Sequence, residues 1–371
     1  MHNALPPSSC RLHRALLLVA LSFAAAMPRC AEAQSKVAEV TSTIGTRHPS
    51  GAMAFSPDGK TLALAGAGDG SVVELWNLET GKARILRSSF NKENTPCTDA
   101  IAFSRDGRCL AVEHQEPGIT VWDLDSGKEQ AHVPMPTPKS YVKGMAFADG
   151  HRTLVAILTV PSGKEHRVVN DLLESREDHT VIRWDVAMDK NVGTFVFDPF
   201  LMFRAISPDG RYAVLQHAKG QDIFDLMTDR QVCTIHHVGG FVFSEDGSSL
   251  VGIYRDHLSV WEIPSGRQLR RLTFDPPRDG SYTSMGAIAL SPDKKSVAVL
   301  GFEGKKNLVG LLSSESGLLL DRFECCPFGM IGRAVVFSPD GRMLATDTYA
   351  MNSRDLSVDP LLKLWRLPVT W

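Results

Sequence analysis

The sequence predicts an all-β fold made of seven copies of one strand-and-turn unit. The first observation is a turn motif related to Ser-Pro-Asp-Gly, which occurs seven times and places its aspartates at Asp58, Asp106, Asp149, Asp209, Asp246, Asp293 and Asp340. These aspartates are spaced at intervals typical of repeats of about 40–50 residues. The second observation is an aromatic motif that follows the turn in six copies. The third is the alternation of apolar residues around the turns, which is typical of β-hairpins.

The turn motif is explained by backbone conformation. In the first copy, Met53-Ala54-Phe55-Ser56-Pro57-Asp58-Gly59, proline presets φ at the second turn position and glycine accepts a positive φ at the fourth. Apolar residues alternate in 51–55 before the turn and in 61–65 after it. We therefore interpret the seven aspartates as turn-forming residues and not as metal ligands.

The aromatic motif predicts a half-buried strand that ends in a second tight turn. Its first copy reads Leu75-Trp76-Asn77-Leu78-Glu79-Thr80-Gly81. The aromatic position is filled in turn by Trp76, Trp122, Trp184, Phe224, Trp261 and Trp365, while Leu312 takes it in the sixth copy. In the first six copies, of which Leu312 is the sixth, a glycine or an aspartate stands five residues after this position. Glycine tolerates a left-handed turn best, and aspartate tolerates it better than most residues.

At these residues the sequence resembles the WD-repeat (WD40) family of β-propellers, and the resemblance covers the chain from about residue 34 to its end. It implies seven radial blades, each a four-stranded antiparallel sheet. The tryptophans favour this family over the TolB-type propellers, which share the Ser-Pro-Asp-Gly turn. The sequence departs from the family pattern in lacking a Gly-His pair before each repeat. The family's aspartate before the aromatic strand is clear only at Asp69, Asp178 and Asp256.

The chain ends predict how the ring closes. Only six residues follow Trp365, which is too few for an ordinary fourth strand after a turn. Residues 36–44 precede the first repeat and have no hairpin of their own. We expect them to supply the outer strand of the seventh blade, so that the sheet has no open seam. The prediction is one seven-bladed ring without a second domain.

The first 33 residues predict a secretory signal peptide. Basic Arg11 and Arg14 precede an apolar run over 15–27, and Ala31-Glu32-Ala33 matches a cleavage site. The mature domain then spans 34–371, in the periplasm or outside the cell. No apolar run reaches the length of about 18 residues that a membrane span needs. Five cysteines stay in the mature chain, and we expect this odd number to leave free thiols and not a disulfide framework.

Two faces of the predicted ring differ in their loops. The short turns of both motifs share one face, while the insertions at 161–178 and 347–359 and the connections between blades share the other. Functional residues concentrate on variable loops held by a rigid frame. Aromatic rings and a histidine stand near the starts of successive innermost strands, and we predict that they contact a partner: Tyr141, Phe200, His237, Tyr282 and Phe328.

Motifs of catalysis and metal binding are missing from the sequence. It has no His-Glu-x-x-His, phosphate-binding loop, nucleophile elbow or Cys-x-x-Cys. We interpret His236-His237 as a surface pair, and Glu174, Glu177, Asp178 and His179 as charges that keep a long loop solvated. A net charge of −2 gives no indication of nucleic-acid binding.

The resulting hypothesis is a monomeric, non-catalytic scaffold for a protein or peptide partner, without cofactor or metal. Two alternatives stay open: an enzyme with its site in the central channel, and a binder of carbohydrate or envelope polymer.

Overall fold

The computed structural model describes residues 38–45, 52–67, 72–89, 100–114, 118–161, 167–169, 172–174, 177–198, 201–217, 219–236, 239–254, 256–274, 287–303, 306–326, 330–350 and 361–368. Contacts divide the chain into two units, Met1–Lys36 and Val37–Trp371, and all described residues belong to the second. The described residues of this second unit form strands joined by turns and short connections.

Seven four-stranded antiparallel sheets form the blades, numbered here in chain order. Blade 1 holds β2 (Ala52–Phe55), β3 (Thr61–Ala67), β4 (Val72–Asn77) and β5 (Lys82–Arg87). Blade 2 holds β6 (Ile101–Phe103), β7 (Cys109–His114), β8 (Gly118–Asp123) and β9 (Lys128–Pro134). Blade 3 holds β10 (Tyr141–Ala148), β11 (Thr153–Pro161), β14 (Glu177–Asp185) and β15 (Lys190–Val196). Blade 4 holds β16 (Met202–Ile206), β17 (Tyr212–His217), β18 (Gly220–Asp225) and β19 (Arg230–Ile235).

The remaining blades follow the same order. Blade 5 holds β20 (Gly240–Phe243), β21 (Ser249–Tyr254), β22 (His257–Glu262) and β23 (Gln268–Thr273). Blade 6 holds β24 (Ile288–Leu290), β25 (Ser296–Glu303), β26 (Lys306–Ser313) and β27 (Leu319–Cys326). Blade 7 holds β28 (Met330–Phe337), β29 (Met343–Ala350), β30 (Leu361–Arg366) and, out of chain order, β1 (Glu39–Gly45). A separate two-stranded sheet, β12 (Arg167–Val169) and β13 (Leu172–Glu174), lies within the third repeat.

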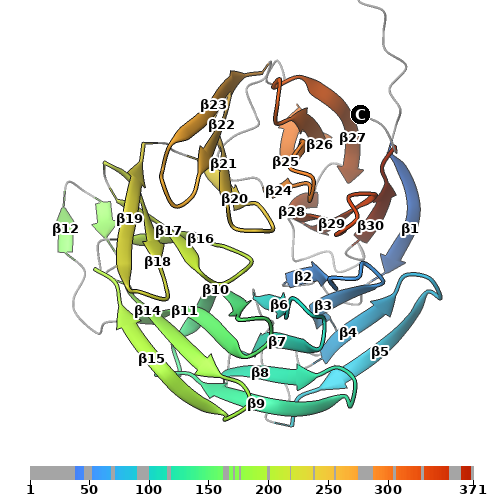
Figure 1. Ribbon diagram of the computed structural model, residues 1–371. Helices are drawn as coiled ribbons and strands as arrows, with labels where there is room; N and C mark the ends of the chain where they lie inside the picture. The colour runs from blue at the N-terminus through green and yellow to red at the C-terminus, as the bar shows by residue number, and fades with distance from the viewer. Residues whose placement is uncertain are drawn as a thin grey trace, which may run out of the picture. The chain divides into compact units, whose positions relative to one another are not determined.

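The first strand of each blade lines the inside of a closed ring (Figure 1). Contacts run from β2 to β6, β10, β16, β20, β24 and β28 in turn, and β28 contacts β2 again. The seven-bladed ring that the sequence predicts is therefore confirmed. We call the side that carries the Ser-Pro-Asp-Gly turns and the turns after the aromatic strands the turn face. The opposite side, with the other loops, is the loop face.

The predicted closing strand is also confirmed. Strand β1 pairs antiparallel with β30, with Val40 opposite Trp365 and Ile44 opposite Leu362. The two strands lie side by side in Figure 1, blue against red. Just before β1, the amide of Ala38 donates to Asp321 Oδ2 of blade 6 at 3.3 Å. This strand therefore joins the two ends of the described chain and reaches the neighbouring blade.

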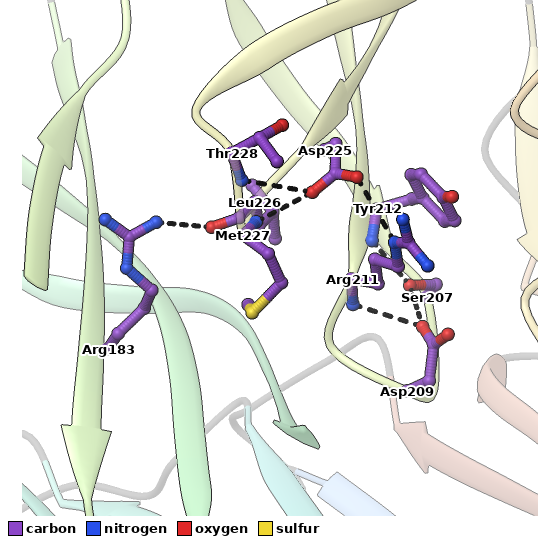
Figure 2. Close-up of polar contacts among 9 residues, drawn as sticks. All are labelled: Arg183, Ser207, Asp209, Arg211, Tyr212, Asp225, Leu226, Met227 and Thr228. Carbon is purple, nitrogen blue, oxygen red and sulfur yellow. Dashed lines mark hydrogen bonds and ion pairs between the residues drawn. The ribbon is translucent and has the colours of Figure 1, made fainter. Parts of the chain in front are cut away.

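The turn aspartates accept hydrogen bonds within their own turns, which agrees with their interpretation as turn-forming residues. In six copies the serine Oγ donates to the aspartate Oδ1 at 2.5–2.7 Å. Figure 2 shows the fourth copy, where Asp209 Oδ1 also accepts from the Arg211 amide, and Ser207 Oγ accepts from the Tyr212 amide. The third copy has Ala148 in place of serine, and Asp149 adopts a φ of 54°.

The second turn adopts the predicted left-handed conformation in blades 1 to 6. Gly81 and Gly317 have φ values of 66° and 75°, and the aspartates Asp189 and Asp229 have values of 46° and 57°. Leu312 occupies the aromatic position of blade 6 and is completely buried. Blade 6 therefore keeps the shape of the repeat without the aromatic ring.

Apolar side chains fill the spaces between neighbouring blades. Trp122 of blade 2, for example, is buried with Leu110 of its own blade against Ala63, Val73 and Leu86 of blade 1. Burial of this kind stabilises by about 25 cal/mol for each Å² of apolar surface. Because every blade packs against two others, the ring holds each blade in a fixed position.

Cys109 and Cys233 are free thiols, and burial raises the pKa of each to about 11. Cys325 is buried, and its Sγ donates to the carbonyl of Asn307 at 3.4 Å. Within the described ranges, no helix has the length and hydropathy that crossing a membrane requires.

Candidate functional site

Tyr141 is the predicted contact residue that the structure describes. It begins β10 on the loop face, is half-buried, and has the Nζ of Lys143 4.6 Å from its ring centroid. A cation at this distance is attracted by the face of the ring. Four other predicted residues lie outside the described residues, namely Phe200, His237, Tyr282 and Phe328. The predicted aromatic ring as a whole therefore stays a prediction.

Met202 is an exposed apolar residue on the strand next to that of Tyr141, and sequence reasoning missed it. It begins β16, the innermost strand of the neighbouring blade 4, and 57% of it is exposed. Its neighbour Phe203 instead packs on Gly144 of blade 3, where an added Cβ would lie 2.8 Å from the ring. Strands β10 and β16 contact each other. Tyr141 and Met202 thus begin adjacent strands on the loop face.

The insertion in the third repeat forms strands where a solvated loop was expected. Strands β11 and β14 are longer than their counterparts in the other blades, and Pro161 still pairs with Glu177. Beyond them, β12 and β13 pair through Val168 and Leu173. Because this insertion joins the second and third strands of blade 3, it extends the blade on the loop face.

The interpretation of His179 as part of a solvated charged loop is wrong. His179 is buried on β14, where its Nδ1 lies 3.2 Å from Thr159 Oγ1. Its Nε2 accepts from the Phe203 amide of blade 4 at 3.4 Å. The imidazole therefore joins blades 3 and 4. Sequence reasoning missed this role because the partner residue Phe203 lies 24 residues later on another strand, whose register was unknown.

Glu113 is a buried carboxylate at the loop-face end of β7. Its Oε1 accepts a hydrogen bond from the Val142 amide of blade 3 at 2.6 Å. A hydrogen bond to a charged acceptor is stronger than one between neutral groups. Glu113 therefore joins blades 2 and 3, much as His179 joins blades 3 and 4.

His114 follows Glu113 but faces the opposite side of the sheet, because successive side chains of a strand alternate. Its ring meets Trp122 edge-on, with 5.7 Å between the centroids, at the junction with blade 1. Neither ring nitrogen has a hydrogen-bond partner among the described residues. Burial lowers the pKa of His114 to about 4 and also lowers the pKa of His132. Glu113 and His114 thus serve two different blade junctions and do not form an acid–base pair.

Potential metal ligands do not gather within the described part of the chain. No three His, Cys, Asp or Glu side chains lie there as a group that could hold an ion.

Comparison with known proteins supports the fold. No family model matches the sequence, and no curated protein matches it either. Among solved structures, the β-propeller domain of Cps50 (Swd1) from Myceliophteria thermophila is similar, with a TM-score of 0.66 and 18% sequence identity. The match covers 90% of this chain and 100% of that domain. This likeness shows that the chain has the β-propeller fold.

Proposed function

We propose that this chain is an exported scaffold that binds a protein or peptide partner through its loop face and catalyses no reaction. The observation that carries the proposal is the combination on one face of Tyr141, Met202 and the extended β11–β14 hairpin of blade 3. An aromatic residue and an exposed methionine are side chains enriched at protein interfaces. The closed ring holds them in fixed positions, which lowers the entropy lost on binding.

Export is supported by the leader pattern of the first 33 residues, which ends at Ala33. The mature protein, in this proposal, begins near Gln34 and acts as a single copy. The thiols of Cys109 and Cys325 are compatible with an oxidising compartment because both are buried. Buried thiols react slowly, since the thiolate is the reactive form and burial disfavours it.

Partner capture from the exported compartment tests the loop face. The variant Tyr141→Ala/Met202→Ser should recover at least about tenfold less partner than the wild type, as expected when central contact residues are truncated. Met188→Ser is the matched control, because Met188 is 50% exposed but lies in the turn after β14 on the turn face. Undiminished capture by the double variant would remove the proposed site.

The same preparation shows where the chain is located. The proposal expects a mature N-terminus near Gln34 in the exported fraction. A full-length chain confined to the cytoplasm would contradict export without affecting the proposed binding face. Retention of a glycan by the wild type, with no protein captured, would instead support the carbohydrate-binding alternative.

A further inference from the structure

The innermost strands of the ring carry positive charges and no negative ones. Strands β2, β6, β10, β16, β20, β24 and β28 contain no aspartate or glutamate. Their charged residues are Lys143 of β10, Arg204 of β16 and Arg333 of β28. Because the whole chain has a net charge of −2, these cations are a local feature of the inside of the ring.

Each of these cations is the extra residue of a β-bulge. In β10, Val142 and Gly144 pair with consecutive residues of β11, so that Lys143 between them has no partner in the ladder. Arg204 and Arg333 are the extra residues of the corresponding bulges in β16 and β28. The other four innermost strands pair without a bulge. Since a bulge changes the direction of the side chain at its extra residue, the three bulges redirect cations and no other residue type.

The bulges turn Lys143 and Arg204 away from the packed junctions between blades. Val142 packs in the core shared with blade 2, and Gly144 contacts the Phe203 ring of blade 4, whereas Lys143 between them is exposed. Arg204 is likewise exposed between two residues that pack toward blades 3 and 5. An innermost strand pairs along one edge, and its other edge faces the inside of the ring. The two cations therefore extend toward the inside of the ring.

Neutral groups hold both cations in place. Lys143 Nζ lies 4.6 Å from the ring centroid of Tyr141, and Arg204 Nε donates to Gln216 Oε1 at 2.6 Å. Neither cation forms an ion pair with a carboxylate in the part of the chain that the structure describes. Because β10 and β16 contact each other, the two positive charges stand on neighbouring strands.

The carboxylates nearest to the bulges in the register belong to second strands and are buried. Glu113 of β7 accepts the amide of Val142, and Asp347 of β29 stands opposite Ala334. Each of the two acidic residues is 2% exposed. A ligand inside the ring therefore contacts the cations and is kept from these carboxylates.

We propose that the inside of the ring binds an acidic peptide segment of the partner protein, whose carboxylates contact Lys143 and Arg204. Hydrogen bonds between a carboxylate and a cation are about twice as strong as those between neutral groups. Blade 7 lies across the ring from blades 3 and 4 (Figure 1), so Arg333 adds a third positive charge to the opposite wall. This inference rests on the proposed function, because it names the chemistry of the segment that the loop face binds.

The surroundings favour a peptide over other polyanions. Tyr141 and the exposed Met202 begin the same two strands that carry the cations, so apolar side chains beside the acidic residues reach them. A nucleic acid requires a basic patch or stripe along a surface, whereas these cations are confined to the inside of the ring. The segment therefore combines acidic residues with apolar neighbours.

The test uses two fluorescent peptides with the purified mature chain. One is Gly-Asp-Glu-Asp-Glu-Gly, and the other is its neutral amide counterpart, Gly-Asn-Gln-Asn-Gln-Gly. We expect the acidic peptide to bind at least about tenfold tighter than the amide peptide. Its affinity should fall as salt rises from about 0.1 M to about 1 M, because the Debye length shortens from about 10 Å to about 3 Å. Lys143→Gln/Arg204→Gln should weaken its binding by at least about tenfold.

Lys82→Gln/Lys128→Gln is the matched control. It removes the same charge from two exposed lysines of outer strands and should leave binding unchanged. An unchanged thermal midpoint of Lys143→Gln/Arg204→Gln shows that the ring still folds. Equal affinities for the two peptides, full binding by Lys143→Gln/Arg204→Gln, or binding of an oligogalacturonate without the acidic peptide would each overturn the inference. Partner capture by Tyr141→Ala/Met202→Ser tests the proposed function separately, so the two failures are distinguishable.

Discussion

Replacing His114 with leucine is expected to reduce the loss of stability that the chain suffers between pH 7 and pH 5. His114 is 2% exposed, and its ring nitrogens lack hydrogen-bond partners among the described residues. Burial disfavours the charged imidazole and lowers its pKa to about 4. An unfolded chain exposes the same imidazole to water, where its pKa is about 6.5. Unfolding is therefore accompanied by proton uptake at pH 5.

The direction of the effect follows from this difference. Stability rises with pH wherever the unfolded state binds more protons. The contribution of the neutral His114 to the free energy of unfolding is thus present above about pH 6.5 and is lost as the pH falls toward about 4. Below that pH this contribution changes no further. One pKa unit corresponds to about 1.4 kcal/mol, so the full loss is about 3 kcal/mol and the loss at pH 5 about 2 kcal/mol.

Neighbouring charges act on His114 in both directions. Glu129 raises the pKa of His114, and His132 lowers it, while desolvation is the largest influence. Leucine is a suitable replacement because it is apolar and because Leu158 holds the equivalent strand position in blade 3. Urea unfolding at pH 7 and pH 5 measures the difference, with the exposed His236→Gln as control. The explanation fails if His114→Leu and the wild type lose the same free energy on acidification.

Removing β1 is expected to destabilise the ring by several kcal/mol. Without residues 38–45, β30 loses its antiparallel partner, and the Trp365 side chain loses part of the apolar packing that buries it. Each net hydrogen bond contributes about 1 kcal/mol, and the burial of apolar surface adds to this. The exposed edge of β30 would also favour aggregation, because an unpaired strand is a template for another chain.

A permuted chain provides the matched control for this deletion. Residues 38–45 placed behind a short linker after residue 368 can pair with β30 as an ordinary hairpin, since Glu39 lies opposite Arg366. The urea midpoint should fall in the deletion and recover in the permuted chain. A deletion as stable as the wild type, judged by circular dichroism and urea unfolding, would show that β1 does not hold the ring.

The turn motifs could be predicted from the sequence because their chemistry is local. Ser207 and Asp209 are two residues apart, and their hydrogen bond forms inside a single turn. The left-handed conformation of Asp229 likewise depends on its own turn. The closing strand could be predicted because the six residues after Trp365 are too few for a fourth strand. Residues 36–44, ahead of the first repeat, have no hairpin of their own and could supply it.

Contacts between blades could not be predicted in the same way. Which side of a strand faces the next blade depends on the register, and an irregularity shifts the register by one residue. Such a shift occurs between Val142 and Gly144. The links of Glu113 to Val142, of His179 to Phe203, and of Arg84 to Leu124 all cross from one blade to another. They differ at each junction, so no repeated motif revealed them.

A disulfide between β1 and β30 tests the closed ring most directly. Thr43 lies opposite Lys363, and paired residues of an antiparallel sheet are close enough for cysteines at these positions to bond. The variant Thr43→Cys/Lys363→Cys should form this bond, identified by mass spectrometry of the linked peptides. In Thr43→Cys/Arg366→Cys the second cysteine lies about 10 Å further along the strand, and no bond should form. Absence of the first bond, or equal formation of both, would contradict a ring closed by its own first strand.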